Sequence, residues 1–162
     1  MRIAEEHKNL KIALGFNFHN NTKEEIYRAL DPLYDKVDYM SAVGGRFKFP
    51  YSPTMLQHPE DIPPRYPDDS IKDWLLEAYG DKLSIFYVYD TQQVKRQTYM
   101  DAAGQLNCDA LIVIDTDETI HPDYVTPEIW EHFYKQIYYM KQFDGEEPGV
   151  LSMWLWDPSK ED

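Results

Sequence analysis

The chain has 162 residues, of which 43% are hydrophobic, and 29 acidic against 16 basic residues give it a formal net charge of −13. This composition excludes a disordered chain and predicts a globular protein with a sizeable core. An acidic surface repels phosphate backbones, so nucleic-acid binding through a basic face is not expected. A ligand that carries phosphate would need a local cation, either a metal ion, an arginine or a helix N-terminus.

The single cysteine, Cys108, excludes an intrachain disulfide and a zinc site built from several thiolates. Residues 1–11 are charged and lack the apolar core of a signal peptide. No run approaches the roughly 20 apolar residues that span a bilayer. We therefore expect one cytoplasmic domain over residues 1–162, without a transmembrane segment, and leave open whether it forms oligomers.

The first strand is expected over residues 11–16, because the sequence KIALGF is apolar and follows a polar leader. A helix over residues 23–36 follows, since Thr22 and Glu25 match a capping box and apolar residues recur at helical spacing. A second strand over residues 38–43 ends at a double glycine. This order of elements begins an alternation of strands and helices.

Residues 46–68 have no periodicity and contain six prolines. A loop of this length is often functional or disordered, and its aromatic residues favour an ordered loop that packs on the body. A helix is then expected over residues 71–79, a strand over 83–89 and a helix over 92–104. Capping residues, branched and aromatic content and terminal glycines mark these three elements.

Residues 110–115 are the most apolar strand, and their near-continuous run predicts a central strand covered on both faces. Thr126, Pro127 and Glu128 begin a helix, because they supply a capping hydroxyl, a proline at the first helical position and an acid at the positive end of the dipole. Residues 149–156 predict a last strand. The alternation predicts an α/β fold in three Rossmann-like layers with a mostly parallel central sheet.

Three carboxylates, Asp115, Asp117 and Glu118, stand within four residues directly after the apolar strand. Ligands of open α/β sheets bind beyond the carboxyl ends of the strands. Crowded carboxylates repel one another unless a cation neutralises them, and hard oxygen ligands suit Mg²⁺ or Mn²⁺. An ordinary acidic turn explains the same pattern equally well, so both interpretations stay open at this point.

The string DTDET resembles the nucleophile motif of haloacid-dehalogenase phosphatases. This resemblance implies that Asp115 is a nucleophile, Asp117 a general acid and Thr119 its neighbour. In that family the motif lies on the first strand and the remaining motifs follow it. Here three strand–helix units precede the motif and 43 residues follow Thr119, so the order of elements favours another family.

A second resemblance, to family-2-like glycosyltransferases of the GT-A fold, covers most of the chain. The strand, polar loop and helix of KIALGFNFHNNTKEEIYRAL come first, followed by the turn in SAVGGRF and the helix start at Asp69-Ser70. The Lys95-Arg96 pair and an apolar strand then lead to Asp-x-Asp. The resemblance implies a short or truncated, inverting, metal-dependent glycosyltransferase. Its donor would be a UDP- or GDP-linked sugar, and its acceptor is unknown.

The resemblance implies a role for each matching residue. Asp117 would ligate an Mn²⁺ or Mg²⁺ ion that stabilises the diphosphate leaving group as a Lewis acid. Asp115 would contact the ribose or share that metal, and His121 is a further metal candidate. Lys95 and Arg96 would supply the local cation for the nucleotide. The implied nucleotide-sugar-binding residues are Phe16, Asn17, Gly44, Gly45, Arg46, Asp69, Ser70, Lys95, Arg96, Asp115 and Thr116.

Two departures from the family pattern bear on activity. Gly44 stands where many relatives carry an aspartate that contacts base and ribose, so this polar contact is lost. The resemblance implies that the loop from Phe16 to His19 holds the base. No acceptor-side base is identified, and Asp157 and Asp162 are the candidates near the last strand. The alternative function is a non-catalytic nucleotide-sugar-binding module or a degenerate glycosyltransferase scaffold.

Overall fold

The computed structural model describes residues 9–48, 60, 62, 64–120 and 126–142, together with the backbone of residues 155 and 156. Its strands are β1 (Ile12–Phe18), β2 (Tyr39–Gly44), β3 (Leu83–Tyr87), β4 (Ala110–Asp115), β5 (Thr119–Ile120) and β6 (Leu155–Trp156). Its helices are α1 (Lys23–Leu30), the short 3-10 helix η2 (Tyr34–Lys36), α3 (Asp69–Tyr79), α4 (Gln92–Gln105) and α5 (Pro127–Gln142). None of the described helices is both long enough and apolar enough to cross a membrane.

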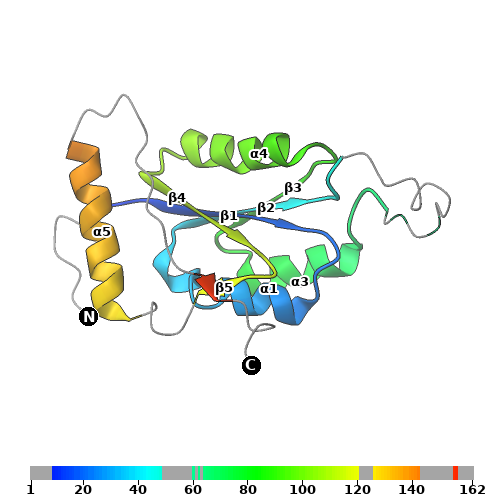
Figure 1. The fold of residues 1–162 in the computed structure, drawn as a ribbon, viewed down its shortest axis with the longest axis horizontal. Coiled ribbons are helices and arrows are strands. Elements are labelled where there is room, and N and C mark those ends of the chain that lie inside the picture. Colours follow the sequence, from blue (N-terminus) through cyan, green and yellow to red (C-terminus); the bar gives the residue numbers. More distant parts are fainter. Residues whose placement is uncertain are drawn as a thin grey trace.

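Four strands form the central sheet in the order β3-β2-β1-β4, and every neighbouring pair is parallel. Helix α4 lies on one face of this sheet, and α1 and α3 lie on the other (Figure 1). Strands β5 and β6 form a separate antiparallel pair. The predicted α/β fold, with three Rossmann-like layers around a parallel sheet, is therefore confirmed.

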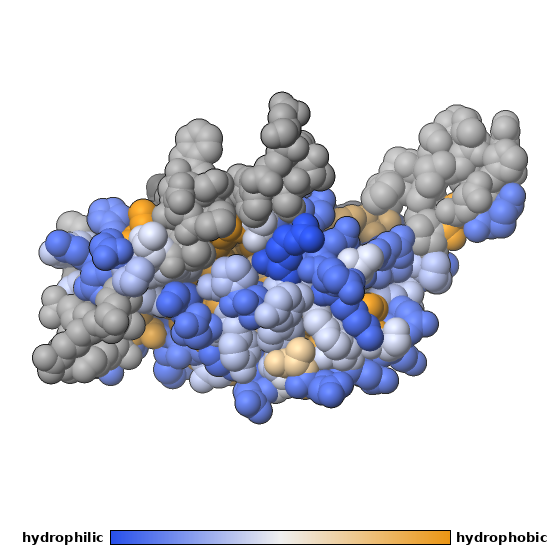
Figure 2. Space-filling view, turned by 90° about the horizontal axis from the view of Figure 1, so that it is seen from below, coloured by the Kyte–Doolittle hydropathy of each residue, from blue (hydrophilic) through white to orange (hydrophobic). Residues whose placement is uncertain are grey.

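Strand β1 runs through the middle of the molecule, and all of its residues are buried. Ile12, Leu14 and Phe16 belong to the hydrophobic core on the side of α1 and α3. The intervening residues face α4, since a Cβ added at Gly15 would meet the ring of Tyr99. The outer surface on the side of α1 and α3 is mainly hydrophilic (Figure 2), as amphipathic helices over a buried face require.

The helix predicted over residues 23–36 was too long, because α1 ends at Leu30 and only the short helix η2 follows. Pro32 has no N–H and cannot donate to the carbonyl of Arg28, four residues earlier. That carbonyl accepts a hydrogen bond of 2.9 Å from Thr119 Oγ1 instead. The proline therefore ends the helix and also frees an acceptor that fixes the start of β5.

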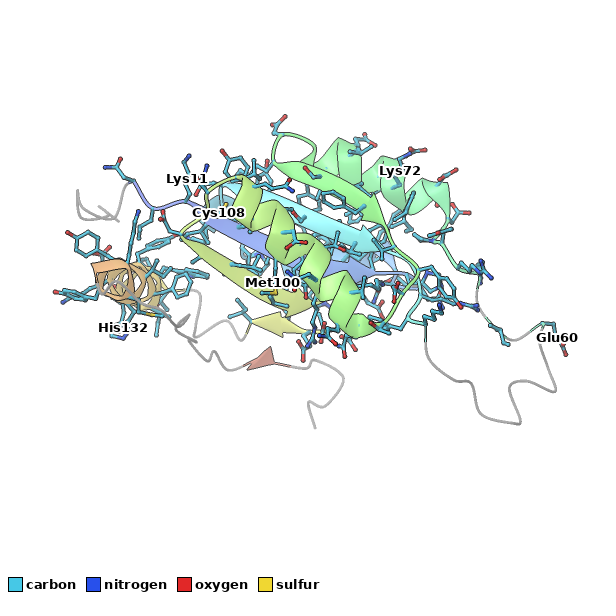
Figure 3. All side chains as sticks on the ribbon, turned by 90° about the horizontal axis from the view of Figure 1, so that it is seen from above. Lys11, Glu60, Lys72, Met100, Cys108 and His132 are labelled. Atoms are coloured by element: carbon cyan, nitrogen blue, oxygen red, sulfur yellow. The ribbon has the colours of Figure 1, made fainter. Side chains whose placement is uncertain are left out.

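Strand β4 was predicted to be central and covered on both faces, and this prediction was wrong for the described sheet. It lies at one edge of the four strands, and the Val113 side chain is 45% exposed. Ile112 and Ile114 pack on the core side. Helix α4 crosses the other face over β1 and β2 (Figure 3), so it leaves part of β4 uncovered. An apolar run predicts that a strand is largely buried, but it does not give the position of that strand in the sheet.

The Pro-rich loop is described at its two ends. Phe47 forms a parallel bridge with Asp90, and the Arg46 N–H donates to the Arg65 carbonyl over 3.0 Å. Both ends therefore pack at the carboxyl edge of β2 and β3, whereas residues 49–59 lie outside the described part. Most of the strand predicted over residues 149–156 also lies outside it, and its last two residues pair with β5.

Candidate ligand site at the carboxyl edge of the sheet

The connections of the sheet reverse direction between β1 and β4. Helices α1 and α3 lead from β1 to β2 and β3 on one face, and α4 leads from β3 to β4 on the other (Figure 1). Ligands of open α/β folds bind outside the carboxyl ends of the strands at such a switch point. Asn17 and Asp115 are paired in register there. Because register partners of parallel strands share a face, both side chains lie on the α4 side.

Helix α4 carries three residues toward this edge. Thr91 caps it by accepting a hydrogen bond from the Val94 N–H over 3.3 Å. Lys95 and Tyr99 are four residues apart, so they lie on one face of the helix, and both are buried against the sheet. Arg96 is exposed beside them. Of the predicted Lys-Arg pair, Lys95 is therefore buried against the sheet and Arg96 faces the solvent.

The Lys95 side chain, only 1% exposed, connects α4 to the turn after β2. Its ammonium group donates to the Gly45 carbonyl and lies 4.4 Å from the centroid of the Phe47 ring. Burial lowers the pKa of this amine to about 8. Gly45 has a φ of 132°, and a Cβ there would collide with the Val88 carbonyl, so only glycine fits this turn.

Asn17 and Tyr99 each keep an unsatisfied polar atom at the switch point. The Asn17 side chain is 8% exposed, and neither its Oδ1 nor the Tyr99 hydroxyl has a hydrogen-bond partner in the described part of the chain. A buried atom of this kind costs about 1 to 3 kcal/mol. Burial raises the pKa of Tyr99; the Asp115 carboxylate adds to this rise, and Arg96 opposes it. These four residues therefore form one polar group.

His19 lies at the same end of β1, two residues beyond Asn17. Both of its ring nitrogens are buried. Burial lowers the pKa of His19 below 6.5, the cations Lys95 and Arg46 lower it further, and a hydrogen bond with the Pro64 backbone opposes them. The imidazole is therefore neutral at pH 7. From the sequence, His19 was predicted only as the end of the loop that follows the first strand, although its position after β1 was a usable signal.

Basic side chains gather beyond β2 and β3 despite the acidic composition. The Arg46 guanidinium lies 5.1 Å from the centroid of the Tyr89 ring and donates to its hydroxyl over 3.4 Å. Arg65 lies over the same ring at 4.8 Å. Together with Lys95, these residues supply the local cations that an anionic ligand needs in a protein of net charge −13.

The acidic segment forms a tight turn after β4. The Glu118 N–H donates to the Asp115 carbonyl over 3.0 Å, which places Asp117 at the tip. Thr116 is buried and donates to the Asn17 carbonyl over 3.0 Å. The turn is thereby attached to the end of β1, and its carboxylates lie next to the switch point.

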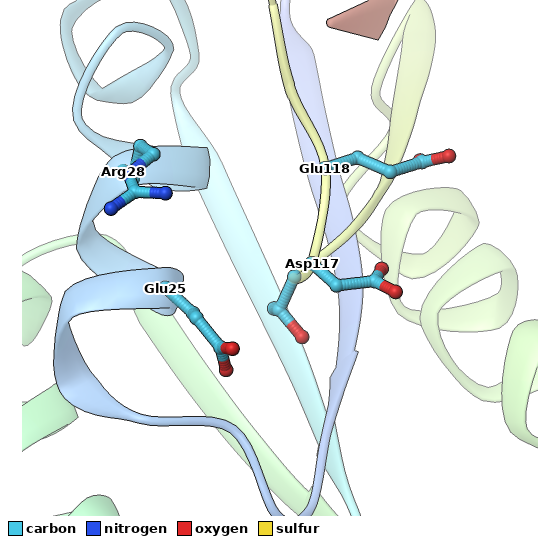
Figure 4. A pocket seen from close by; sticks show the side chains of 5 residues that line it. Glu25, Arg28, Asp117 and Glu118 are labelled. Atoms are coloured by element: carbon cyan, nitrogen blue, oxygen red, sulfur yellow. The ribbon is translucent and has the colours of Figure 1, made fainter. Parts of the chain in front are cut away.

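A small pocket adjoins this turn. Figure 4 shows the side chains of Asp117 and Glu118 on the same side of the turn, pointing away from α1. No three His, Cys, Asp or Glu side chains of the described residues come close enough to hold a metal ion by themselves. Magnesium is usually held by one or two carboxylates together with substrate phosphates and water, so these oxygen donors suit Mg²⁺ or Mn²⁺ bound with a diphosphate. The pocket is lined by Glu25, Arg28, Thr116, Asp117 and Glu118.

The remaining predicted site residues are dispersed. Phe16 is fully buried in the core, on the face of the sheet opposite α4. Gly44 packs on the same core side, where a Cβ would meet the rings of Phe18 and Tyr87. Two residues, Asp69 and Ser70, are exposed at the start of α3. The candidates His121, Asp157 and Asp162 lie outside the described residues.

No family model, curated protein sequence or solved structure matches this chain. Three kinds of polar group follow one another along the carboxyl edge of the sheet. Cations lie at β2 and β3, unsatisfied polar atoms at β1, and carboxylates at β4. Such a series can contact an elongated ligand that is polar at one end and phosphorylated at the other.

Proposed function

We propose that this chain is the donor-binding domain of a metal-dependent glycosyltransferase of the GT-A type, which transfers a sugar from a nucleotide diphosphate. The observation that supports it best is the pairing of Asn17 with Asp115 at the switch point. The cations of α4 and β2 lie on one side of this pair, and the acidic turn lies on the other. A nucleotide sugar fits this arrangement, because its diphosphate can be held by a metal at the acidic turn and by the cations of α4 while its ribose reaches Asp115.

Each group of the edge has a task in this proposal. Asp115 accepts hydrogen bonds from the ribose hydroxyls, and Asp117 at the tip of the turn ligates Mn²⁺ or Mg²⁺. When bound there, the metal supplies Lewis-acid stabilisation of the diphosphate leaving group. The exposed guanidinium of Arg96 pairs with phosphate oxygens, for which its forked geometry is suited.

A cytoplasmic location is part of the same proposal. Cys108 is a free thiol of intermediate exposure, and thiols persist in reducing compartments. The acceptor is left unassigned, because the acidic candidates Asp157 and Asp162 lie outside the described residues.

Calorimetric titration of UDP and GDP, with and without Mn²⁺, tests the donor site on wild type and Asp117→Ala. Asp81→Ala is the matched control, because this exposed carboxylate lies before β3, at the opposite edge of the sheet. We expect manganese-dependent binding that is lost in Asp117→Ala and retained in Asp81→Ala. Failure of both nucleotides to bind under every metal condition would reject the proposal.

Product analysis then separates the possible activities. Hydrolysis of the bound donor in the presence of Mn²⁺ supports an enzyme, whereas binding without turnover supports a non-catalytic nucleotide-sugar-binding module. Hydrolysis of a simple phosphate ester that disappears in Asp115→Asn would instead favour a phosphatase in which Asp115 is the nucleophile.

A further inference from the structure

Two tyrosine rings with exposed faces lie together at the carboxyl end of β3. Tyr87 is the last residue of β3, and Tyr66 belongs to the segment that precedes α3. Their ring centroids are 5.8 Å apart, at an interplanar angle of 49°. Both remain accessible, since Tyr66 is 48% exposed and Tyr87 is 38% exposed. Contiguous apolar patches of this kind mark interaction surfaces more than scattered exposed side chains do.

This pair, which we call the tyrosine patch, lies on the side of the sheet opposite α4. A Cβ added at Gly44 would meet the rings of Tyr87 and Phe18, and Phe18 belongs to the core on the side of α1 and α3. Helix α3 begins at the same end of the sheet (Figure 1). The patch is therefore separate from the α4 side, where Arg96 and the unsatisfied atoms of the switch point lie.

Polar groups of both signs lie beside the tyrosine patch. Burial raises the pKa of Tyr87, and the nearby carboxylates of Asp69 and Asp73 raise it further. Both carboxylates are exposed in the first turns of α3. The exposed guanidinium of Arg65 lies 4.8 Å from the centroid of the neighbouring Tyr89 ring. Hydrogen-bond donors and acceptors therefore accompany the exposed ring faces.

These groups decide the class of ligand that fits. An anion would meet the carboxylates, and a cation would meet the guanidinium. A partner protein buries about 800 Å² on each side, whereas two half-exposed tyrosines supply roughly 200 Å² at most. A neutral saccharide matches all of these features, because each of its hydroxyl groups both donates and accepts. The C–H groups on one face of a sugar ring also pack on the negative face of an aromatic ring.

We propose that the tyrosine patch binds a neutral saccharide chain without a metal ion. One sugar ring packs on each tyrosine, because the 5.8 Å between the ring centroids is comparable with the spacing of neighbouring rings in such a chain. Asp69 and Asp73 accept hydrogen bonds from the hydroxyl groups, and Arg65 donates to them. This site goes beyond the proposed function, since it involves neither the nucleotide nor the acidic turn.

Titration calorimetry with maltohexaose, cellohexaose and chitohexaose tests the tyrosine patch in the absence of nucleotide and metal. We expect wild type to bind at least one of the three with a dissociation constant below about 1 mM. Tyr66→Ala should weaken that binding at least about tenfold, because it removes one ring face. Tyr139→Ala is the matched control and should bind as wild type does. Tyr139 lies on α5, is 49% exposed and also contacts a second tyrosine ring, that of Tyr138.

The outcomes are independent of the nucleotide site. Failure of wild type to bind any of the three saccharides overturns the inference, and so does equal weakening by Tyr66→Ala and Tyr139→Ala. Asp117→Ala should bind the saccharide as wild type does, so its loss of nucleotide binding tests the proposed function separately. Tyr66 lies outside the helices and strands, and thermal unfolding of Tyr66→Ala beside Tyr139→Ala excludes a general loss of stability as the cause.

Discussion

The ring of Tyr99 packs directly on Gly15. A Cβ added at Gly15 would lie 2.6 Å from the Cγ and Cδ2 atoms of that ring. Gly15 is in the middle of the buried strand β1, and Tyr99 is on α4. The absence of a side chain therefore sets the distance between α4 and the sheet. It also sets the position of Lys95 and Arg96, which lie on the same helix.

Substitution of Gly15 by alanine is expected to destabilise the fold by about 1 to 3 kcal/mol, the usual cost of overpacking a close contact. The ring of Tyr99 is held between helix and strand, so it cannot move without shifting α4. Urea-induced unfolding followed by circular dichroism measures the free-energy change. Nucleotide binding should weaken as well, because a shifted α4 displaces Arg96.

Gly104 provides the matched control for this substitution. It lies in α4, and a Cβ added there would meet nothing within 4 Å. Alanine in a helix is favoured over glycine by about 0.5 to 1 kcal/mol, so Gly104→Ala should stabilise the protein. Equal effects of the two substitutions would show that the Gly15 contact does not control the helix position.

Tyr79 and Tyr134 form a second matched pair. Both are buried, and burial raises the pKa of each to about 12. The Tyr134 hydroxyl donates to the Lys36 carbonyl over 3.1 Å, whereas the Tyr79 hydroxyl has no hydrogen-bond partner among the described residues. Tyr134→Phe should therefore cost about 0.5 to 1.5 kcal/mol.

Tyr79→Phe should be neutral or stabilising, because it removes a buried hydroxyl that forms no hydrogen bond within the described part of the protein. Thermal unfolding of the two variants beside wild type distinguishes them. A larger loss for Tyr79→Phe than for Tyr134→Phe would contradict this assignment of the hydroxyl groups.

Much of the fold was predictable because its signals are local. The capping box at Thr22 correctly marked the start of α1. Strand β4 was predicted with its observed bounds. Its place at the edge of the described sheet was not predictable, because strand order depends on contacts between distant segments. The early end of α1 was missed because its apolar periodicity continues through Pro32, which ends the helix.

The candidate site was predictable in part for the same reason. Asp115 and Asp117 were found because they follow an apolar strand directly. The burial of Lys95 depends on the rotation of α4 over Gly15, and a sequence pattern does not give this rotation. The unsatisfied oxygen of Asn17 was equally hidden, since it depends on which side chains surround β1.

Titration of Lys95 makes the free energy of unfolding depend on pH. Burial lowers its pKa to about 8 in the folded protein, against about 10.4 for a free lysine. Between these values the unfolded chain binds more protons, so the free energy of unfolding increases as pH rises from 8 to 10. Below pH 8 both states are protonated, and this contribution stays constant.

Comparison of wild type with Lys95→Met isolates this contribution from other titrating groups. The unfolding free energy of wild type minus that of the variant should increase by on the order of 2 to 3 kcal/mol between pH 7 and pH 10. Urea titrations of both proteins at the two pH values give the difference. A constant difference would mean that the folded and unfolded states protonate Lys95 alike.

Arg96 is expected to contribute to the affinity for the ligand and not to the stability of the fold. Its side chain is exposed, yet its guanidinium is close enough to Tyr99 to oppose the rise in the pKa of that hydroxyl. Arg96→Met should weaken binding of UDP with Mn²⁺ about tenfold or more, because hydrogen bonds between ions are roughly twice as strong as neutral ones. The melting temperature should stay within about one degree, since a surface substitution changes stability by at most about 0.5 kcal/mol.

Lys11→Met controls for the loss of one positive charge, because exposed Lys11 precedes β1 at the opposite edge of the sheet. Long-range attraction of an anionic ligand would be reduced equally by both substitutions and would disappear at high salt. A direct contact predicts that only Arg96→Met weakens binding and that much of the loss persists in 0.5 M salt. Equal losses of affinity in the two variants would show that Arg96 acts only through long-range electrostatic attraction and does not contact the ligand.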